Sequence, residues 1–357
     1  MQNDSFEFLK KLLETPSPSG FEQDIQRVVK RRVSSYADSV RVDVHGNLIA
    51  TANPTGKIRV MLAGHCDQIG FMVTHIDDQG YIWFNAIGGI DPSVLPGSRV
   101  TLLAADGKID GIIGYKAVHL IPAHERGKAI ELNKLWIDIG AKDGKEAKAK
   151  ISVGDAIVYH PGILRLGKNI ISSPGCDDRV GVYVVMEALR LFKKEARARK
   201  SPVALYAVST VQEEIGLRGA KTSCYGIDPL VGIAVDVTHA SDCPGVDAKQ
   251  VGTVKMAGGP SIARGPNINP EIEKLLVETA KKKKITVQML AAPGATGTDA
   301  NMLQVSRSGV AAALVGIPNR YMHTQVETID LRDLESAAKL IAETCLRITS
   351  RMDFIPS

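Results

Sequence analysis

The sequence predicts an α/β protein that carries an inserted all-β domain. Residues 1–70 and 165–357 alternate helix-like stretches with long apolar strands, which is typical of a sheet covered by helices on its faces. Between these two parts, residues 71–164 contain only short strand-like runs separated by turn signals. A chain of 357 residues is also long enough for two domains. We therefore expect a discontinuous α/β domain that is interrupted by a small β-barrel or sandwich.

The first α/β part begins with helices and continues with strands. The pattern S-x-x-E at residues 19–22 matches a capping box, which predicts a helix N-terminus there. Apolar residues then recur at helical spacing from Phe21 to Val33. Three strand-like runs follow, VRVDV, NLIAT and, at residues 58–65, IRVMLAGH. The order of these segments predicts helices followed by strands of the main sheet.

The middle part has the texture of an all-β domain. The runs GFMVTHI and YIWFNAI flank a DDQG turn, and VTLLA and KIDGIIG flank the Asp106–Gly107 turn. KLWIDIG and DAIVYH complete the series, and no convincing helix occurs among these short strands. Short strands at this spacing favour a small barrel or sandwich.

After residue 165 the alternation of helix and strand resumes. Apolar residues at helical spacing from Val182 to Phe192 predict a helix, and PVALYAVST and VGIAVDVT are continuous apolar strands. Strands of this kind are buried on both faces. GVAAALVGIP predicts a further strand, and residues 330–350 predict a closing amphipathic helix.

The composition of the chain indicates which kinds of binding partner and which cellular compartment to expect. The net charge is +5, but Lys and Arg are scattered and aromatic residues make up only 5%, so we expect no nucleic-acid partner. No stretch approaches eighteen apolar residues, and the N-terminus lacks the apolar core of a signal peptide, so we expect no membrane partner. The five cysteines are widely spaced without a CxxC pair, which favours a reducing compartment and a cytoplasmic location.

Polar residues follow the apolar strands at the points where the strands end. Because ligands collect beyond the carboxyl ends of strands in α/β sheets, these residues are candidates for one site. Each strand or loop contributes one or two of them, namely His65 and Asp67, Asp177 and Asp178, Glu213 and Glu214, Asp236 with His239, and His323. Five separate segments of the chain therefore deliver the same kinds of side chain.

Imidazole and carboxylate ligands without a cysteine cluster suit zinc, cobalt or manganese. Two histidines and three carboxylates can hold two divalent ions if one carboxylate bridges them, and such a pair activates water and polarises a carbonyl. Neighbouring residues on extended backbone point in opposite directions. Glu214 is therefore expected to bind a metal while Glu213 acts as general base on the activated water. Asp67, two residues after His65, is expected to orient the metal-bound imidazole, as carboxylates beside metal-binding histidines usually do.

Taken singly, each of these residues also has a structural interpretation. His65 alone resembles a core histidine, Asp236 a turn former, and Glu213 and Glu214 solvent-facing acids. Asp178 is better explained as a helix N-terminal acid, with Arg179 as a partner. Cys66 and Cys176 are interpreted as small buried thiols.

Residues 293–301 form a candidate pocket wall. Asp299 within them faces that pocket or, in the interpretation that we favour, caps the next helix. The role of His239 stays open.

The motifs AGHCDQIG, GCDDRVG, VQEEIGLRGA, AVDVTHA and RYMHTQVETIDLRDL together resemble the tetrahedral (TET) aminopeptidases. These are cocatalytic metallopeptidases that include glutamyl and deblocking aminopeptidases and are often labelled endoglucanases. The resemblance covers nearly the whole chain. It implies a zinc-peptidase-like three-layer αβα domain with an inserted barrel-like dimerisation domain. It also implies dimers that assemble further into tetrahedral dodecamers.

The resemblance further implies a role for each candidate residue. Two divalent ions, zinc or cobalt, are expected: His65 and Asp236 bind one, Glu214 and His323 bind the other, and Asp177 bridges both. Glu213 becomes the general base and acid, and Asp67 orients His65. The implied reaction removes N-terminal residues from short peptides, with a hydroxide that bridges the ions as nucleophile.

Three alternatives stay open at this point. A two-metal carboxypeptidase or an N-deacylase uses the same ligands on a different substrate end, and a non-enzymatic scaffold needs no ions. The preferred N-terminal residue and the physiological metal are not predicted.

Overall fold

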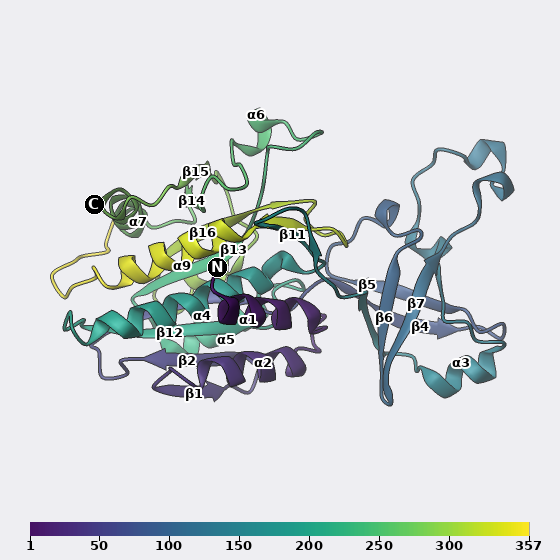
Figure 1. Cartoon of the computed structure of the whole chain (residues 1–357), viewed down its shortest axis with the longest axis horizontal. Helices are drawn as coiled ribbons and strands as arrows, with labels where there is room; N and C mark the ends of the chain where they lie inside the picture. Colours follow the sequence, from purple (N-terminus) through teal and green to yellow (C-terminus); the bar gives the residue numbers. More distant parts are fainter. Residues whose placement is uncertain (357) are drawn as a thin grey trace.

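A computed structural model describes residues 1–356 of the chain. It has two bodies side by side, a large sheet with its helices and a smaller barrel that projects from one end (Figure 1). The α/β class with an inserted all-β domain is therefore confirmed. The barrel strands lie between Gly70 and Tyr159. The division at 1–70, 71–164 and 165–357 stays a prediction.

The main sheet has eleven strands, of which the first nine run in the order β1-β2-β12-β3-β13-β16-β17-β11-β10. β14 pairs with β16 and with β15. The eleven strands are β1 (Ser39–Val42), β2 (Leu48–Ala52), β3 (Ile58–His65), β10 (Leu164–Arg165), β11 (Ile170–Ser172), β12 (Val203–Thr210), β13 (Val231–His239), β14 (Ser261–Arg264), β15 (Gln288–Ala291), β16 (Ala311–Arg320) and β17 (Thr328–Asp330). The central strands β12, β3, β13 and β16 are parallel. Their carboxyl ends therefore lie along one edge of the sheet.

Helices cover both faces of this sheet, which gives the three-layer αβα arrangement (Figure 1). They are α1 (Asn3–Glu14), α2 (Gln23–Val33), α4 (Cys176–Ala196), α5 (Arg218–Ile227), α7 (Pro270–Lys283), α8 (Asp299–Gln304) and α9 (Leu331–Cys345), whereas the short α6 (Ala248–Val251) stands away from the sheet. One apolar core joins α1, α4 and α9 to the sheet, and a second core joins α5 and α8 to its other face. No described helix is both long enough and apolar enough to cross a membrane.

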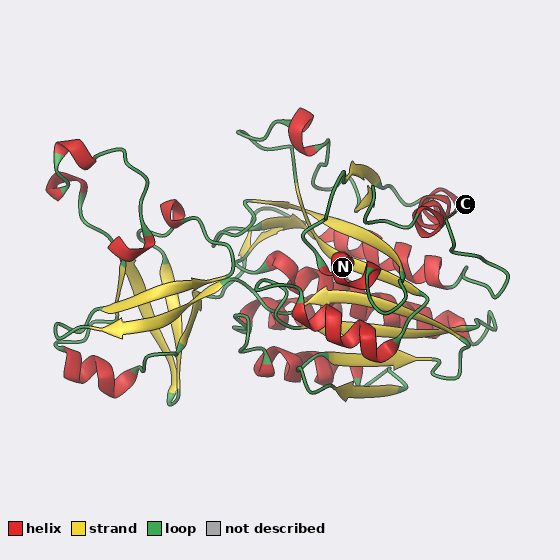
Figure 2. Ribbon diagram, turned by 180° about the vertical axis from the view of Figure 1, so that it is seen from behind, coloured by secondary structure: helices red, strands yellow, loops and turns green. Residues whose placement is uncertain are grey.

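The inserted body is a closed antiparallel barrel with its own apolar core (Figure 2). Its strands are β4 (Gly70–Ile76), β5 (Ile82–Ile87), β6 (Arg99–Ala104), β7 (Gly107–Gly114), β8 (Trp136–Asp138) and β9 (Ala156–Tyr159). The expectation of no helix in this part was wrong. Gly144–Lys150 form α3, whose N-cap Asp143 accepts a hydrogen bond from the backbone N–H of Glu146.

The predicted capping box at residues 19–22 is wrong, because its two side chains serve other partners. α2 begins at Gln23, and its N-cap residue Glu22 makes no side-chain cap. The Ser19 hydroxyl donates instead to Asp67 Oδ2 over 2.6 Å. Glu22 Oε1 accepts the backbone N–H of Gln212 over 3.1 Å, in the turn after β12. Both residues therefore support the carboxyl edge of the sheet.

Candidate metal centre

The carboxyl edge of the parallel strands collects the residues that the sequence singled out. His65 is the last residue of β3 and lies beside Thr210, the last residue of β12. Asp236 lies near the end of the neighbouring strand β13. Glu213 and Glu214 follow β12, and His323 lies in the turn after β16. The topology thus brings side chains from distant parts of the chain to one place.

A close approach of α4 to β3 brings a further carboxylate to this edge. A Cβ on Gly64 would lie 2.6 Å from the backbone of Gly181, so only glycine allows β3 and α4 to come this close. Asp178 accepts the backbone N–H groups of His65 and Gly181 over 3.2 and 3.0 Å. The start of α4 is thereby tied to the end of β3, with Asp177 beside His65.

The candidate ligand atoms form two groups that share Asp177. In one, His65 Nε2 lies 3.1 Å from Asp177 Oδ1 and 4.0 Å from Asp236 Oδ1. In the other, His323 Nε2 lies 3.3 Å from Asp177 Oδ2 and 3.6 Å from Glu214 Oε2. All the candidate atoms within each group lie within 4.8 Å of one another. Of the described histidines, only these two belong to a ligand group.

The donor set fits divalent cations. Glu214 Oε1 is buried and has no hydrogen-bond partner, although an unpaired buried carboxylate oxygen is costly. The other oxygen of the same carboxylate, Oε2, lies 3.6 Å from His323 Nε2, so a cation held by Asp177, Glu214 and His323 would compensate this buried carboxylate. Imidazole nitrogen together with carboxylate oxygen is a donor set that zinc and neighbouring metals accept.

Glu213 stands beside the first group without belonging to it. Its Oε2 lies 3.8 Å from His65 Nε2. The predicted alternation of Glu213 and Glu214 on extended backbone is wrong, because β12 ends at Thr210 and a turn follows. Both carboxylates face the same cluster, one on the His65 side and one on the His323 side.

Asp67 anchors the turn that carries these two glutamates. Its carboxylate accepts the backbone N–H of Glu213 over 3.0 Å and that of Glu214 over 3.1 Å. His65 Nδ1 lies 3.1 Å from the Asp67 backbone oxygen and 3.4 Å from Oδ1. The same residue therefore contacts the imidazole and the loop of the candidate base.

Glu327 anchors the backbone around the second ligand group, as Asp67 does around Glu213 and Glu214. This residue was not identified from the sequence. It is fully buried and accepts the backbone N–H groups of Asp177 and His323 over 3.0 and 2.8 Å. His323 has a φ of 62°, a region that non-glycine residues avoid. The hydrogen bond to Glu327 helps to hold this residue in that conformation. Its position four residues after His323 was the only available signal.

Two further interpretations of acidic residues are corrected by the structure. Arg179 does not pair with Asp178, since its guanidinium donates to the backbone oxygens of Gly175, Pro174, Leu12 and Thr15. Asp299 does not cap α8, because Thr298 is the N-cap residue.

The Asp299 side chain turns toward β12. Its Oδ2 accepts the Thr210 hydroxyl over 2.6 Å, and its Oδ1 is buried without a partner. Burial, opposed by His65 and by the Thr210 hydrogen bond, raises the pKa of Asp299 to about 6.

Crowding of acids in a buried site shifts the proton affinities of the cluster in both directions. Burial, aided by neighbouring carboxylates, raises the pKa of Asp236 and Glu214 well above the usual range, and that of Glu213 to about 10. Burial lowers the pKa of His65, but the carboxylates of Glu213, Asp177 and Asp67 outweigh it and raise the value. Asp177 lies between both imidazoles, which overcome its burial and hold its pKa well below the ordinary value.

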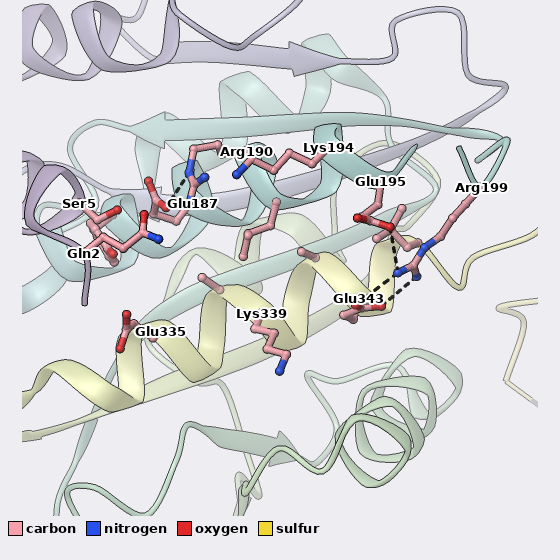
Figure 3. Close-up of a pocket in the computed structure, with 15 residues that line it drawn as sticks. Gln2, Ser5, Glu187, Arg190, Lys194, Glu195, Arg199, Glu335, Lys339 and Glu343 are labelled. Atoms are coloured by element: carbon pink, nitrogen blue, oxygen red, sulfur yellow. Dashed lines mark hydrogen bonds and ion pairs between the residues drawn. The ribbon is translucent and has the colours of Figure 1, made fainter. Parts of the chain in front are cut away.

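The cluster opens into a cavity of about 400 Å³, a size typical of small-ligand sites. Residues Ala295 to Thr298 form part of its wall, as does the exposed His239. A second cavity of about 430 Å³ lies between α4 and α9 (Figure 3). Several of its charged groups pair with one another, as Arg199 does with Glu195 and Glu343 and Arg190 with Glu187, and its described lining residues include no histidine or cysteine. The first cavity is therefore the candidate active site.

An αβα domain with an inserted barrel and a buried His/carboxylate cluster defines a class of peptide-hydrolysing enzymes, the aminopeptidases of the TET type. The chain is 39% identical over 98% of its length to the lysyl aminopeptidase of Pyrococcus furiosus, of which it covers 99%. Residues 46–340 match the M42 glutamyl aminopeptidase family, and the chain belongs to this family.

Solved structures show the same fold. A TET aminopeptidase from a marine sediment archaeon of the Thaumarchaeota superposes with a TM-score of 0.92 and 35% identity, over 98% of this chain and 97% of that one. The Pyrococcus horikoshii TET1 peptidase, which can assemble into a tetrahedron or a large octahedral shell, superposes with a TM-score of 0.84 and 31% identity. That alignment covers 96% of this chain and 100% of the other. Some neighbours carry the name endoglucanase, as the resemblance implied.

Proposed function

We propose that the chain is a two-metal aminopeptidase that removes N-terminal residues from short peptides. His65 and Asp236 hold one ion, Glu214 and His323 hold the other, and Asp177 bridges them. Zinc and cobalt suit this donor set. The observation that carries the proposal is the pair of ligand groups that share Asp177.

The residues around the ions divide the work of the reaction. When bound, the two ions activate a water molecule and polarise the scissile carbonyl. Glu213 takes a proton at its carboxylate and passes it to the leaving amine. Asp67 orients the His65 imidazole and fixes the backbone of Glu213 through its N–H group. With cations bound beside it, the Glu213 carboxylate would have a lower pKa than its raised value and would be available as a base.

The cavity favours the amino end of a peptide over the carboxyl end. A carboxypeptidase holds the free carboxylate of its substrate with a cationic side chain, most often arginine. The described residues that line this cavity include neither Arg nor Lys. The C-terminal carboxylate of a peptide would find no cationic partner beside the acids Glu213 and Asp236. The N-terminal ammonium group of a peptide is attracted to these acids.

The test of this proposal compares peptides that differ only at their ends. After loading with zinc or cobalt, we expect hydrolysis of a free-amine tripeptide amide and at least about 100-fold slower hydrolysis of its N-acetyl derivative. Cleavage that requires a free carboxylate would show a carboxypeptidase, and release of the acyl group a deacylase. Failure to bind metal or to hydrolyse any peptide would support a non-enzymatic scaffold.

Metal binding is expected to release protons and therefore to weaken as the pH falls. Asp236 and Glu214 have raised pKa values without metal, as has His65, yet all three must be deprotonated to bind it. Each proton released changes the apparent affinity about tenfold per pH unit. Calorimetric titration with zinc between pH 6 and 7.5, in buffers of different ionisation enthalpy, measures the number released. An affinity that is independent of pH over this range would contradict the assigned ligands.

We also propose that the chain assembles from dimers through its inserted barrel, and that the domains divide at residues 71 and 164. The likeness to TET peptidases that form closed shells supports this assembly. The barrel supports it as well, because it projects from the catalytic body (Figure 2). A cytoplasmic location remains part of the proposal.

A further inference from the structure

We propose that this site selects peptides whose first residue is neutral and apolar, in preference to lysine, arginine, glutamate or aspartate. The inference rests on the proposed aminopeptidase function and specifies its substrate class. It differs from the specificities in the names lysyl aminopeptidase and glutamyl aminopeptidase, which belong to the relative and to the family.

Burial distinguishes a closed end and a mouth in the cavity beside the metal centre. The closed end is formed by the lining residues outside the metal centre that are between 1% and 7% exposed, namely Ala263, Leu314, Thr298 and Val237. The mouth is formed by the exposed residues His239, Ala295 and Gly297. The closed end therefore lies deep in the protein and next to the sheet, where Asp236 directly precedes Val237.

The polarity of a peptide decides which of its residues enters the closed end. The first residue of the substrate carries the free amine, so no further residue precedes it. The rest of the peptide follows the scissile bond. The remaining peptide must leave through the mouth, so the first side chain is the part that enters the closed end. Residues of that end consequently contact the first side chain rather than the later ones.

The closed end offers no partner to a charged side chain. Among the described lining residues, the acids Asp177, Glu213, Glu214 and Asp236 all belong to the proposed catalytic cluster, and no lining residue is Lys or Arg. His65 and His323 belong to the same cluster. The remaining described lining residues are apolar or small, apart from the hydroxyls of Thr238, Thr296 and Thr298, and His239 at the mouth. A charged side chain that contacts only this end loses hydration without an oppositely charged partner, because the acids of the cavity would be engaged by the metal ions and by the α-amine of the substrate. An apolar side chain instead gains from burial, because its surface is removed from water.

Two neighbouring strands form one wall of the cavity, which runs from the buried Ala263 to the half-buried Leu290. Ala263 of β14 lies opposite Leu290 of β15 in the register of the two parallel strands, and both line the cavity. Met289, the residue before Leu290, is 41% exposed and does not line the cavity. Successive residues of a strand point to opposite faces. Leu290 and Met289 therefore form a matched pair, one facing the substrate and one facing solvent.

The first experiment measures kcat/KM for aminoacyl fluorogenic substrates with Leu, Met, Phe, Ala, Lys, Arg, Glu and Asp as the acyl residue. The metal-loaded full-length protein is used. We expect the best neutral apolar substrate to exceed every charged one by about 10-fold or more. A basic or acidic substrate in first place would overturn the inference while leaving the aminopeptidase function intact. If no free-amine substrate were cleaved at all, the proposed function itself would fall.

The second experiment places a charge in the wall. Leu290→Asp is expected to raise the ratio of kcat/KM for the Lys substrate to that for the Leu substrate at least about tenfold, because it supplies the missing partner. Met289→Asp puts the same charge on the solvent face of the strand. Its ratio is expected to stay within about twofold of the parent value. An unchanged ratio in Leu290→Asp, or an equal change in both variants, would contradict the proposed wall.

A size variant covers the case in which the charged variant does not fold. Leu290→Phe keeps the wall apolar but reduces the space in front of Ala263. Hydrolysis of the Phe substrate should fall at least about fivefold relative to the Ala substrate, since a filled pocket does not accept additional volume without strain. Equal effects on the two substrates would place the first side chain elsewhere.

Discussion

Replacing Glu213 with glutamine is expected to lower kcat by about 10²- to 10⁴-fold, the range that a general acid–base group contributes. Glutamine keeps the shape of the side chain and the backbone hydrogen bond to Asp67, but it cannot take a proton. Glu213 belongs to neither ligand group, so metal content should be retained. The measurements are steady-state kinetics on a free-amine peptide and metal analysis of the same sample.

Glu214→Gln is the matched control for this variant. It removes a charge from the adjacent residue of the same turn, but from a carboxylate that lies in the second ligand group. We expect it to lose metal as well as activity, whereas Glu213→Gln loses activity alone. Near-normal turnover in Glu213→Gln, or loss of metal from it, would show that Glu213 is not the general base.

The sequence predicted where the candidate ligands gather because β-strands have a direction. Once VGIAVDVT and IRVMLAGH are recognised as parallel buried strands, their last polar residues must lie at the same edge of the sheet. That reasoning placed His65 and Asp236 near each other without any knowledge of the turns. The closed barrel was predicted less sharply, since strand spacing does not distinguish a barrel from a sandwich.

The residues that support the site were harder to predict, because their partners are backbone amides far away in the sequence. Asp178 binds the N–H of His65, and Glu327 binds that of Asp177. No local pattern reports such contacts. The same fact explains the failed capping box, since Ser19 serves Asp67 instead of its own helix. Buried polar groups at this edge form hydrogen bonds with residues far away in the sequence. Sequence patterns such as the capping box, which consider only neighbouring residues, therefore do not predict these contacts.

Replacing Asp177 with asparagine is expected to remove both metal ions. It is the only residue of the described chain that the two ligand groups have in common, and its two oxygens face different imidazoles. Loss of an outer-shell partner already costs about 10- to 100-fold in metal affinity, so loss of this direct ligand should cost more than about 100-fold for each ion. Metal analysis after dialysis, together with zinc titration calorimetry, measures the stoichiometry.

Asp236→Asn is the matched control for Asp177→Asn, because it removes a ligand of one ion instead of both. Asp236 belongs to the first group only, so its loss should leave the ion held by Glu214 and His323 and reduce the stoichiometry by one. A general loss of folding would lower metal content equally in both variants, and circular dichroism of the metal-free proteins separates that case. If Asp177→Asn kept one ion at parent affinity, the carboxylate would not bridge, and the two ligand groups would have to be redrawn as independent sites.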